Sequence, residues 1–96
     1  MTVSFHPAAE SELAGAVEYY EEREPGLGYD FAVEVYATID RVVTHPAAWP
    51  FVDEGIRRGM VRRFPYGILY ADQNDKIFAV ALMHLHRAPG YWRRRL

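Results

Sequence analysis

The stretch GIRRGMVRRFPYGILYADQ, residues 55–73, decides the fold of this 96-residue chain. It contains two strand-like runs joined at Phe64-Pro65-Tyr66-Gly67, where proline and glycine interrupt the pattern and indicate a turn. The second run, Ile68 to Asp72, is mostly apolar and is typical of a strand near the centre of a sheet. The stretch therefore predicts two neighbouring strands connected by a tight turn.

The first of these runs interleaves four arginines with apolar residues. Because successive side chains of a strand point to opposite faces, Arg58 and Arg62 should share one face, and Arg57 and Arg63 should share the other. Neither face is purely apolar. We therefore expect this strand to present its guanidinium groups to solvent, to a groove or to acidic neighbours.

The segments on either side show the periodicities of further strands and helices. We expect strands at Thr2 to Phe5 and Lys76 to His84, helices over about residues 8–24 and 28–44, and a loop over residues 46–54. In the first helix, Leu13, Val17 and Tyr20 recur at the spacing of a buried helical stripe. The connection at Pro25-Gly26 is short, so the two helices should form an antiparallel hairpin.

The resulting order of elements is β-α-α-β-β-β, which predicts an α+β fold within a single domain that spans residues 1–96. The helix hairpin should pack on one face of a small, mostly antiparallel sheet and leave the other face for function. In the loop, Trp49 and Phe51 are expected to close one end of the core.

Composition narrows the possible functions. The chain has no cysteine, so disulfides and thiolate metal sites are excluded, and no histidine–carboxylate spacing recommends another metal site. No phosphate-binding glycine loop is present, and we expect no cofactor. No apolar run is long enough for a membrane span, which leads us to expect a cytoplasmic protein.

The net charge of −2 conceals an asymmetry between the two halves of the chain. Residues 1–54 carry eleven acidic groups against two arginines, a charge of −9. Residues 55–96 carry nine basic groups against two aspartates, a charge of +7. The second half is therefore suited to an acidic or polyanionic partner, unless the halves mainly neutralise each other within the fold.

The tail, residues 85–96, has no periodicity and ends in an aromatic pair followed by three arginines. This pattern predicts that Tyr91, Trp92 and residues 93–95 lie outside the core, with Trp92 as an aromatic anchor for a target and Arg93, Arg94 and Arg95 as charge partners. The alternative is that Trp92 folds back onto the sheet and closes it.

The chain resembles the RelE/ParE superfamily of bacterial type II toxins over almost its whole length. The matching segments are AAESELAGAVEYYEE (8–22), PGLGYDF (25–31) with Glu34, HPAAWP (45–50), RRGMVRRFPYGILY (57–70) and AVALMHLHRAPGYWRRR (79–95). The resemblance implies a toxin that a cognate antitoxin of the ParD or RelB kind binds and silences. We expect an acidic, amphipathic antitoxin segment to lie across the helix hairpin and the sheet edges.

The superfamily contains two activities, inhibition of DNA gyrase by ParE-like members and ribosome-dependent cleavage of mRNA by RelE-like members. An RNA-cleaving site needs proton-transfer groups beside cations, and the candidates here are His84, Arg87 and Tyr91. The lysine-and-arginine set of RelE-like enzymes is missing, because Lys76 is the only lysine and lies at a turn.

We therefore favour the ParE-like activity, with the endonuclease as the alternative and a non-catalytic nucleic-acid-binding module as a third possibility. The residues expected to bind the target are basic or aromatic and come from the second half of the chain. They are Arg58, Arg62, Arg63, Arg87, Tyr91, Trp92, Arg93 and Arg94.

Overall fold

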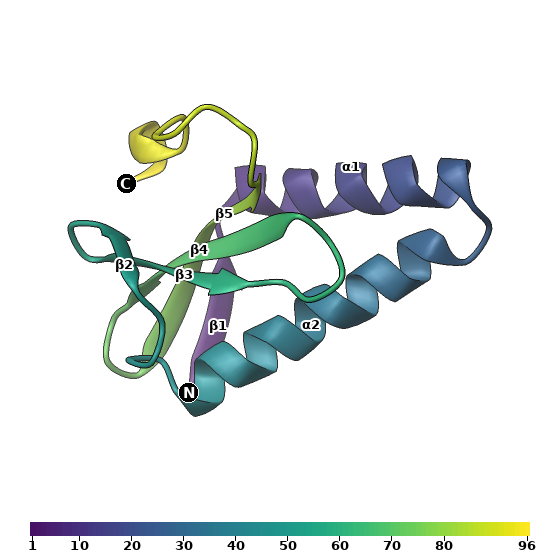
Figure 1. Ribbon diagram of the computed structural model, residues 1–96. Coiled ribbons are helices and arrows are strands. Elements are labelled where there is room, and N and C mark those ends of the chain that lie inside the picture. Colours follow the sequence, from purple (N-terminus) through teal and green to yellow (C-terminus); the bar gives the residue numbers. More distant parts are fainter.

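The computed structural model describes residues 1–96 and consists of two helices packed on a five-stranded sheet (Figure 1). In chain order the elements are β1 (Thr2–Phe5), α1 (Pro7–Arg23), α2 (Leu27–Thr44), β2 (Phe51–Asp53), β3 (Ile56–Met60), β4 (Tyr66–Asp72), β5 (Lys76–His84) and a 3₁₀ turn, η1 (Arg93–Arg95). The predicted α+β class, with a helix hairpin on a mostly antiparallel sheet, is confirmed. The short strand β2 lies within the segment that was predicted to be a loop.

Local sequence accounts for the helix hairpin. Gly26 adopts a left-handed φ of 88°, which side chains with a Cβ atom disfavour, and it ends the connection between the helices. A Cβ atom at Gly28 would lie 2.5 Å from the carbonyl oxygen of Val17, so glycine permits the helices to approach closely here. The carboxylate of Glu21 accepts hydrogen bonds from the amides of Gly26 and Gly28 and so caps the start of α2. Neither helix is both long and apolar enough to cross a membrane.

The strand order in the sheet is β1-β5-β4-β3-β2, with β1 parallel to β5 and every other pair antiparallel. Tyr70 pairs with Ala79 and Leu69 pairs with Ala81, so Val80 is the extra residue of a β-bulge. β1 pairs with β5 only as far as Ala79. The outer edge of β5 beyond that residue therefore has no neighbouring strand.

The helices cover one face of the sheet, and the core between the two layers is centred on Phe31 of α2. Its ring lies 5.1 Å from that of Tyr20, 5.0 Å from that of Phe64 and 4.9 Å from that of Tyr66 between centroids. These offset and edge-on contacts join both helices to the β3–β4 turn. The turn is therefore packed against the helix hairpin.

The second face of the sheet is covered by the tail, so the prediction that this face stays free for function is wrong. Trp92 is only 3% exposed and packs with Ile56, Leu69 and Met83. The prediction that Trp92 lies outside the core is wrong for the same reason, and the alternative, that Trp92 folds back onto the sheet, is confirmed. Pleating gives β3, β4 and β5 a second apolar face, and burying it against an indole ring is favourable.

The arginine-rich run also departs from the prediction. β3 ends at Met60, and both Arg62 and Arg63 lie in the turn before β4, so the strand alternation does not reach them. Of the two loop aromatics, Trp49 packs against the core, whereas Phe51 is 59% exposed and stacks under the guanidinium of Arg57 at 3.8 Å. The expected plug is therefore Trp49 alone.

Candidate functional site

The eight residues predicted to bind a target do not form one cluster. By their contacts they divide among the turn before β4, the edge of β5 beside α1, and the tail-covered face of the sheet. Arg62 and Arg63 lie at the turn, and Arg87 and Tyr91 lie beside Glu12. One small pocket is lined by Arg58, Trp92 and Arg93. Arg94 is exposed. Each location offers different chemistry.

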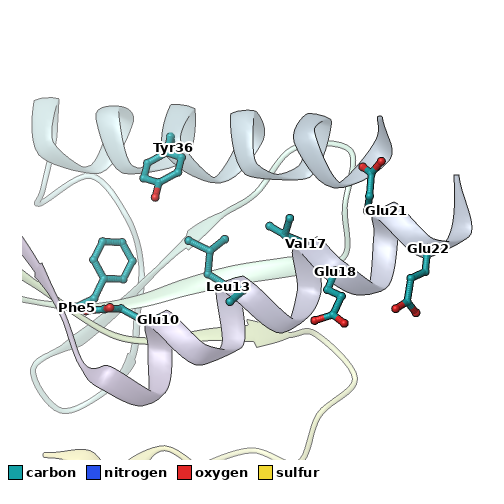
Figure 2. A pocket seen from close by; sticks show the side chains of 9 residues that line it. Phe5, Glu10, Leu13, Val17, Glu18, Glu21, Glu22 and Tyr36 are labelled. Atoms are coloured by element: carbon teal, nitrogen blue, oxygen red, sulfur yellow. The ribbon is translucent and has the colours of Figure 1, made fainter. Parts of the chain in front are cut away.

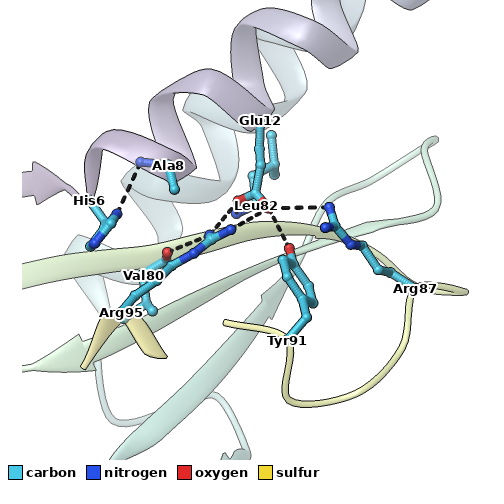
Figure 3. A network of polar contacts seen from close by, with 8 residues as sticks. All are labelled: His6, Ala8, Glu12, Val80, Leu82, Arg87, Tyr91 and Arg95. Atoms are coloured by element: carbon cyan, nitrogen blue, oxygen red, sulfur yellow. Dashed lines mark hydrogen bonds and ion pairs between the residues drawn. The ribbon is translucent and has the colours of Figure 1, made fainter. Parts of the chain in front are cut away.

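A carboxylate of α1, Glu12, organises the β5 edge (Figure 3). Glu12 of α1 accepts hydrogen bonds from the Leu82 amide at 3.1 Å and from the Tyr91 hydroxyl at 2.6 Å. Arg95 donates to both of its oxygens, at 2.8 and 3.0 Å, and Arg87 lies 3.6 Å away. We refer to Glu12, Arg87, Tyr91 and Arg95 as the Glu12 cluster.

The Glu12 cluster completes the edge of β5 where β1 has ended. Besides binding Glu12, Arg95 donates a hydrogen bond to the carbonyl oxygen of Val80 at 3.0 Å. Two residues further along β5, the Leu82 amide donates a hydrogen bond to Glu12. Side chains thus pair with strand groups that would otherwise lack partners. The Glu12 and Arg95 side chains are 13% and 14% exposed, so this contact anchors the tail in a largely buried position.

The electrostatics of the cluster disfavour Tyr91 as a catalytic base. Burial raises the pKa of the Tyr91 hydroxyl, and its hydrogen bond to Glu12 raises the pKa further. The hydrogen bonds that Arg95 makes to Glu12 likewise raise the pKa of its guanidinium. Tyr91 therefore stays protonated at neutral pH and donates to Glu12, while the Arg87 guanidinium covers its ring at 3.8 Å.

His84 lies at the end of β5 in a shallow depression of about 280 Å³ that Glu12, Tyr66 and Arg87 also line. Its Nδ1 accepts a hydrogen bond from the His86 amide at 3.1 Å, and its ring meets the edge of the Tyr66 ring. The predicted catalytic residues His84 and Arg87 are thus brought together, but the Tyr91 hydroxyl is bound to Glu12. No group of three or more histidine and carboxylate side chains is arranged to hold a metal ion.

The turn before β4 presents two exposed cations. Arg62 is exposed and has neither a hydrogen-bond acceptor nor an ion-pair partner in the protein. Arg63 lies 3.7 Å from both Asp30 and Glu34, and its side chain remains 57% exposed. Its φ of 71° is uncommon for a residue with a side chain, and such backbone strain is concentrated at functional sites.

The largest cavity is a groove of about 640 Å³ on the helix hairpin, which we call the hairpin groove (Figure 2). Figure 2 shows Tyr36 of α2 pointing toward Phe5 and Leu13, with Val17 further along α1. Tyr36 is 55% exposed. An apolar groove of this volume falls within the range of ligand and peptide sites.

Sequence reasoning missed the α2 side of this groove, although the signal was present. Tyr29, Val33 and Tyr36 recur at i, i+4 and i+7 on α2, and all three are exposed. They form a second apolar stripe in addition to the buried one that contains Phe31 and Val35. A helix with apolar residues on two sides indicates a partner for the side that its own fold leaves open.

The charge at the rim of the hairpin groove is acidic. Glu10, Glu18, Glu21 and Glu22 line it, and Glu21 is engaged in capping α2. The other three carboxylates have no hydrogen-bond donor or ion-pair partner in the protein. The acidic antitoxin segment expected from the sequence does not suit this groove, which favours an apolar segment flanked by basic residues.

Comparison with known proteins identifies the fold. No protein-family model matches the chain, and no curated protein matches it. A chain in a solved structure described as the chromosomal ParDE TA system from P. aeruginosa has a TM-score of 0.76 to this one at 13% sequence identity. The match covers 90% of this chain and 97% of that chain. The RelE/ParE-like fold that the sequence resemblance implied is therefore confirmed.

Proposed function

We propose that this chain is the toxin component of a type II toxin–antitoxin system and that it acts by binding and inhibiting DNA gyrase. The observation that carries the proposal is the similarity in fold, over nearly the full length of both chains, to part of a ParDE toxin–antitoxin system. Gyrase is a cytoplasmic enzyme, so the proposal includes a cytoplasmic site of action. At 13% identity the target is argued from this chain's own residues.

The proposed antitoxin site is the hairpin groove. An amphipathic segment would insert apolar side chains between Leu13, Val17 and Tyr36, of which Leu13 and Val17 are partly buried and Tyr36 is 55% exposed. Basic residues on either side of that apolar stripe would face Glu10, Glu18 and Glu22. Such charges mainly raise the association rate, so association should slow as salt is added.

The state of the candidate catalytic groups supports gyrase binding over RNA cleavage. An endonuclease needs a group that takes up a proton near neutral pH, and a raised pKa makes Tyr91 unsuitable. Inhibition by binding requires accessible cations and shape instead, and Arg62, Arg63 and Arg94 are exposed. These cations are the proposed contacts with gyrase.

A ribosome-dependent endonuclease is the second candidate, because one observation favours it. The depression beside β5 places His84 and Arg87 together, as a proton-transfer group beside a phosphate-binding cation would require. In that case His84 would be the general acid or base, and Arg87 would have to leave Glu12 to reach a phosphate.

The two candidates are separated by two assays on one preparation of the purified chain. We expect inhibited supercoiling and stabilised DNA breaks when the chain is added to gyrase, and uncut mRNA when it is added to translating ribosomes. His84→Ala should retain gyrase inhibition, since no contact of His84 is required for it. Cleaved mRNA with unaffected supercoiling, abolished by His84→Ala, would replace the gyrase proposal with the endonuclease.

A further inference from the structure

Arg58 differs from every other partly buried arginine in the chain. Three of these four arginines donate to protein acceptors: Arg41 to the Thr38 hydroxyl, Arg57 to the Trp49 carbonyl oxygen, and Arg95 to Glu12 and Val80. Arg58 has no acceptor and no ion-pair partner, and its Nε is buried without a hydrogen bond. A buried, unsatisfied donor on a charged group is unfavourable unless something outside the chain satisfies it.

The surroundings of Arg58 form a pocket of about 240 Å³ on the tail-covered face of the sheet. Leu69, Met83 and Trp92 provide apolar walls, and Arg93 lies at the rim, where Asp53 already binds it at 2.7 Å. Asp53 is thus committed to Arg93, and the charge of Arg58 has no counterpart.

The stem of Arg58 is held in place by the strand beside it. A Cβ atom at Gly67 of β4 would lie 2.9 Å from both Cγ and Cδ of Arg58. The absence of a side chain at Gly67 therefore lets the Arg58 stem lie against the β4 backbone, which limits its motion. A guanidinium that is positioned before a ligand arrives loses little entropy on binding.

We propose that this pocket is a binding site for a carboxylate carried on an apolar stem or ring. The guanidinium of Arg58 would bind the carboxylate, and the stem or ring would lie between Leu69, Met83 and Trp92. The volume is below the range of sites for drug-sized molecules, so the ligand is a small organic acid or one acidic side chain of a protein. The apolar walls favour a carboxylate on an apolar stem over a phosphodiester, because a phosphodiester is flanked on both sides by hydrated sugars. The site stands on Arg58 and its pocket and does not depend on the toxin proposal.

The test is a nuclear magnetic resonance titration that follows the indole N–H of Trp92 and the Nε–H of Arg58. Sodium benzoate represents a free acid, and the blocked peptide acetyl-Ala-Glu-Ala-amide represents an acidic side chain. We expect at least one of the two to shift both signals saturably, and the tighter binder identifies the source of the carboxylate. Benzamide has the same ring without the charge and should bind about tenfold more weakly or not at all.

Variants provide matched controls. Arg58→Met keeps the stem and removes the charge, so it should weaken binding of the effective probe at least about tenfold. Arg23→Met removes an exposed arginine at the end of α1 that does not line the pocket, and it should leave the binding of both probes unchanged. If Arg58→Met does not fold, Arg58→Lys retains the charge but loses the fork of donors, and it should also bind more weakly. The proposal is overturned if benzamide binds as tightly as benzoate, or if both carboxylate probes fail to bind. It is also overturned if Arg58→Met or a folded Arg58→Lys binds the effective probe as tightly as the unmodified chain does, or if inorganic phosphate outcompetes the carboxylates.

Discussion

The hairpin groove and the tail-covered face of the sheet are both apolar surfaces, but the chain treats them in opposite ways. The groove is open, its floor includes a tyrosine that is 55% exposed, and its rim is acidic. The second face of the sheet is closed by Trp92, at 3% exposure, and is surrounded by arginines. Under the proposed function, the open surface is kept for a partner, and the closed surface supports the fold that carries the target-binding cations.

This difference separates stability from recognition. An apolar side chain that the chain's own tail buries stabilises the folded state. An apolar side chain that is exposed to solvent contributes most of its hydrophobic free energy only when a partner covers it, and that contribution is to binding. Substitutions on the second face of the sheet should therefore lower the melting temperature. Substitutions of the exposed groove residues that have no partner in the chain, Tyr36, Glu10, Glu18 and Glu22, should change association without affecting folding.

The largest effect is expected at Trp92. Replacing this side chain by alanine removes an almost fully buried indole, which typically costs about 3–5 kcal/mol. For a chain of this size, Trp92→Ala should lower Tm by more than about 10 °C in calorimetry. Tyr36→Ala in the groove is the matched control and should change the free energy of unfolding by less than about 0.5 kcal/mol. Equal losses for the two variants would refute the contrast between the surfaces.

The next largest effect is expected at Glu12. Glu12→Gln keeps the shape but removes the charge that faces Arg95, and fully buried pairs lose about 3–5 kcal/mol when one partner is removed. Because both side chains retain some exposure, we expect a loss of about 2–3 kcal/mol in urea unfolding. Glu18→Gln, the same change in the same helix at the groove rim, should leave stability within about 0.5 kcal/mol. A Glu12→Gln variant as stable as the Glu18→Gln variant would show that the Glu12 cluster does not anchor the tail.

Alkaline pH should lower the stability of the chain. The pKa of Tyr91 is raised by burial and by Glu12, and burial raises the pKa of Tyr70 to about 12, whereas an unfolded tyrosine has a pKa of about 10. A raised folded pKa contributes stability that is complete below about pH 10 and is lost as the pH rises through the folded value. The free energy of unfolding should therefore fall between about pH 9.5 and 11.5, and less steeply in Tyr91→Phe, where one of the tyrosines with a raised pKa is removed and Tyr20, Tyr66 and Tyr70 remain. An identical slope in Tyr91→Phe would contradict the role assigned to Tyr91.

The smallest effect on stability is expected at the groove rim. Replacing Glu10, Glu18 and Glu22 together by glutamine should leave Tm nearly unchanged, because none of the three has a partner in the protein. The same variant should associate more slowly with the antitoxin, and its rate should depend less on salt. Stopped-flow association at low and high salt checks both points. A rate equal to that of the unmodified chain would remove the charge argument for the groove.

Much of the fold could be predicted from local sequence, whereas the contrast between the two surfaces depends on contacts between residues that are distant in the sequence. The helix periodicity, the apolar run of β5 and the Pro25-Gly26 connection predicted the hairpin and the sheet correctly. The partners of Glu12 lie 70 to 83 residues away along the chain, at Leu82, Tyr91 and Arg95, and no local pattern connects them. The burial of Trp92 could be stated only as an alternative for the same reason, since an aperiodic tail gives no indication of what it will cover.

The central claim is that one surface of the chain binds the antitoxin and another binds the target. The direct test is bacterial growth on induction of the chain, alone and with the product of a neighbouring antitoxin reading frame. Tyr36→Asp in the hairpin groove should still arrest growth but should no longer be rescued. Arg62→Ala, at the turn before β4, should lose toxicity while still co-purifying with the antitoxin. If both variants lose toxicity and antitoxin binding together while remaining folded, the two surfaces are not separate and the account is contradicted.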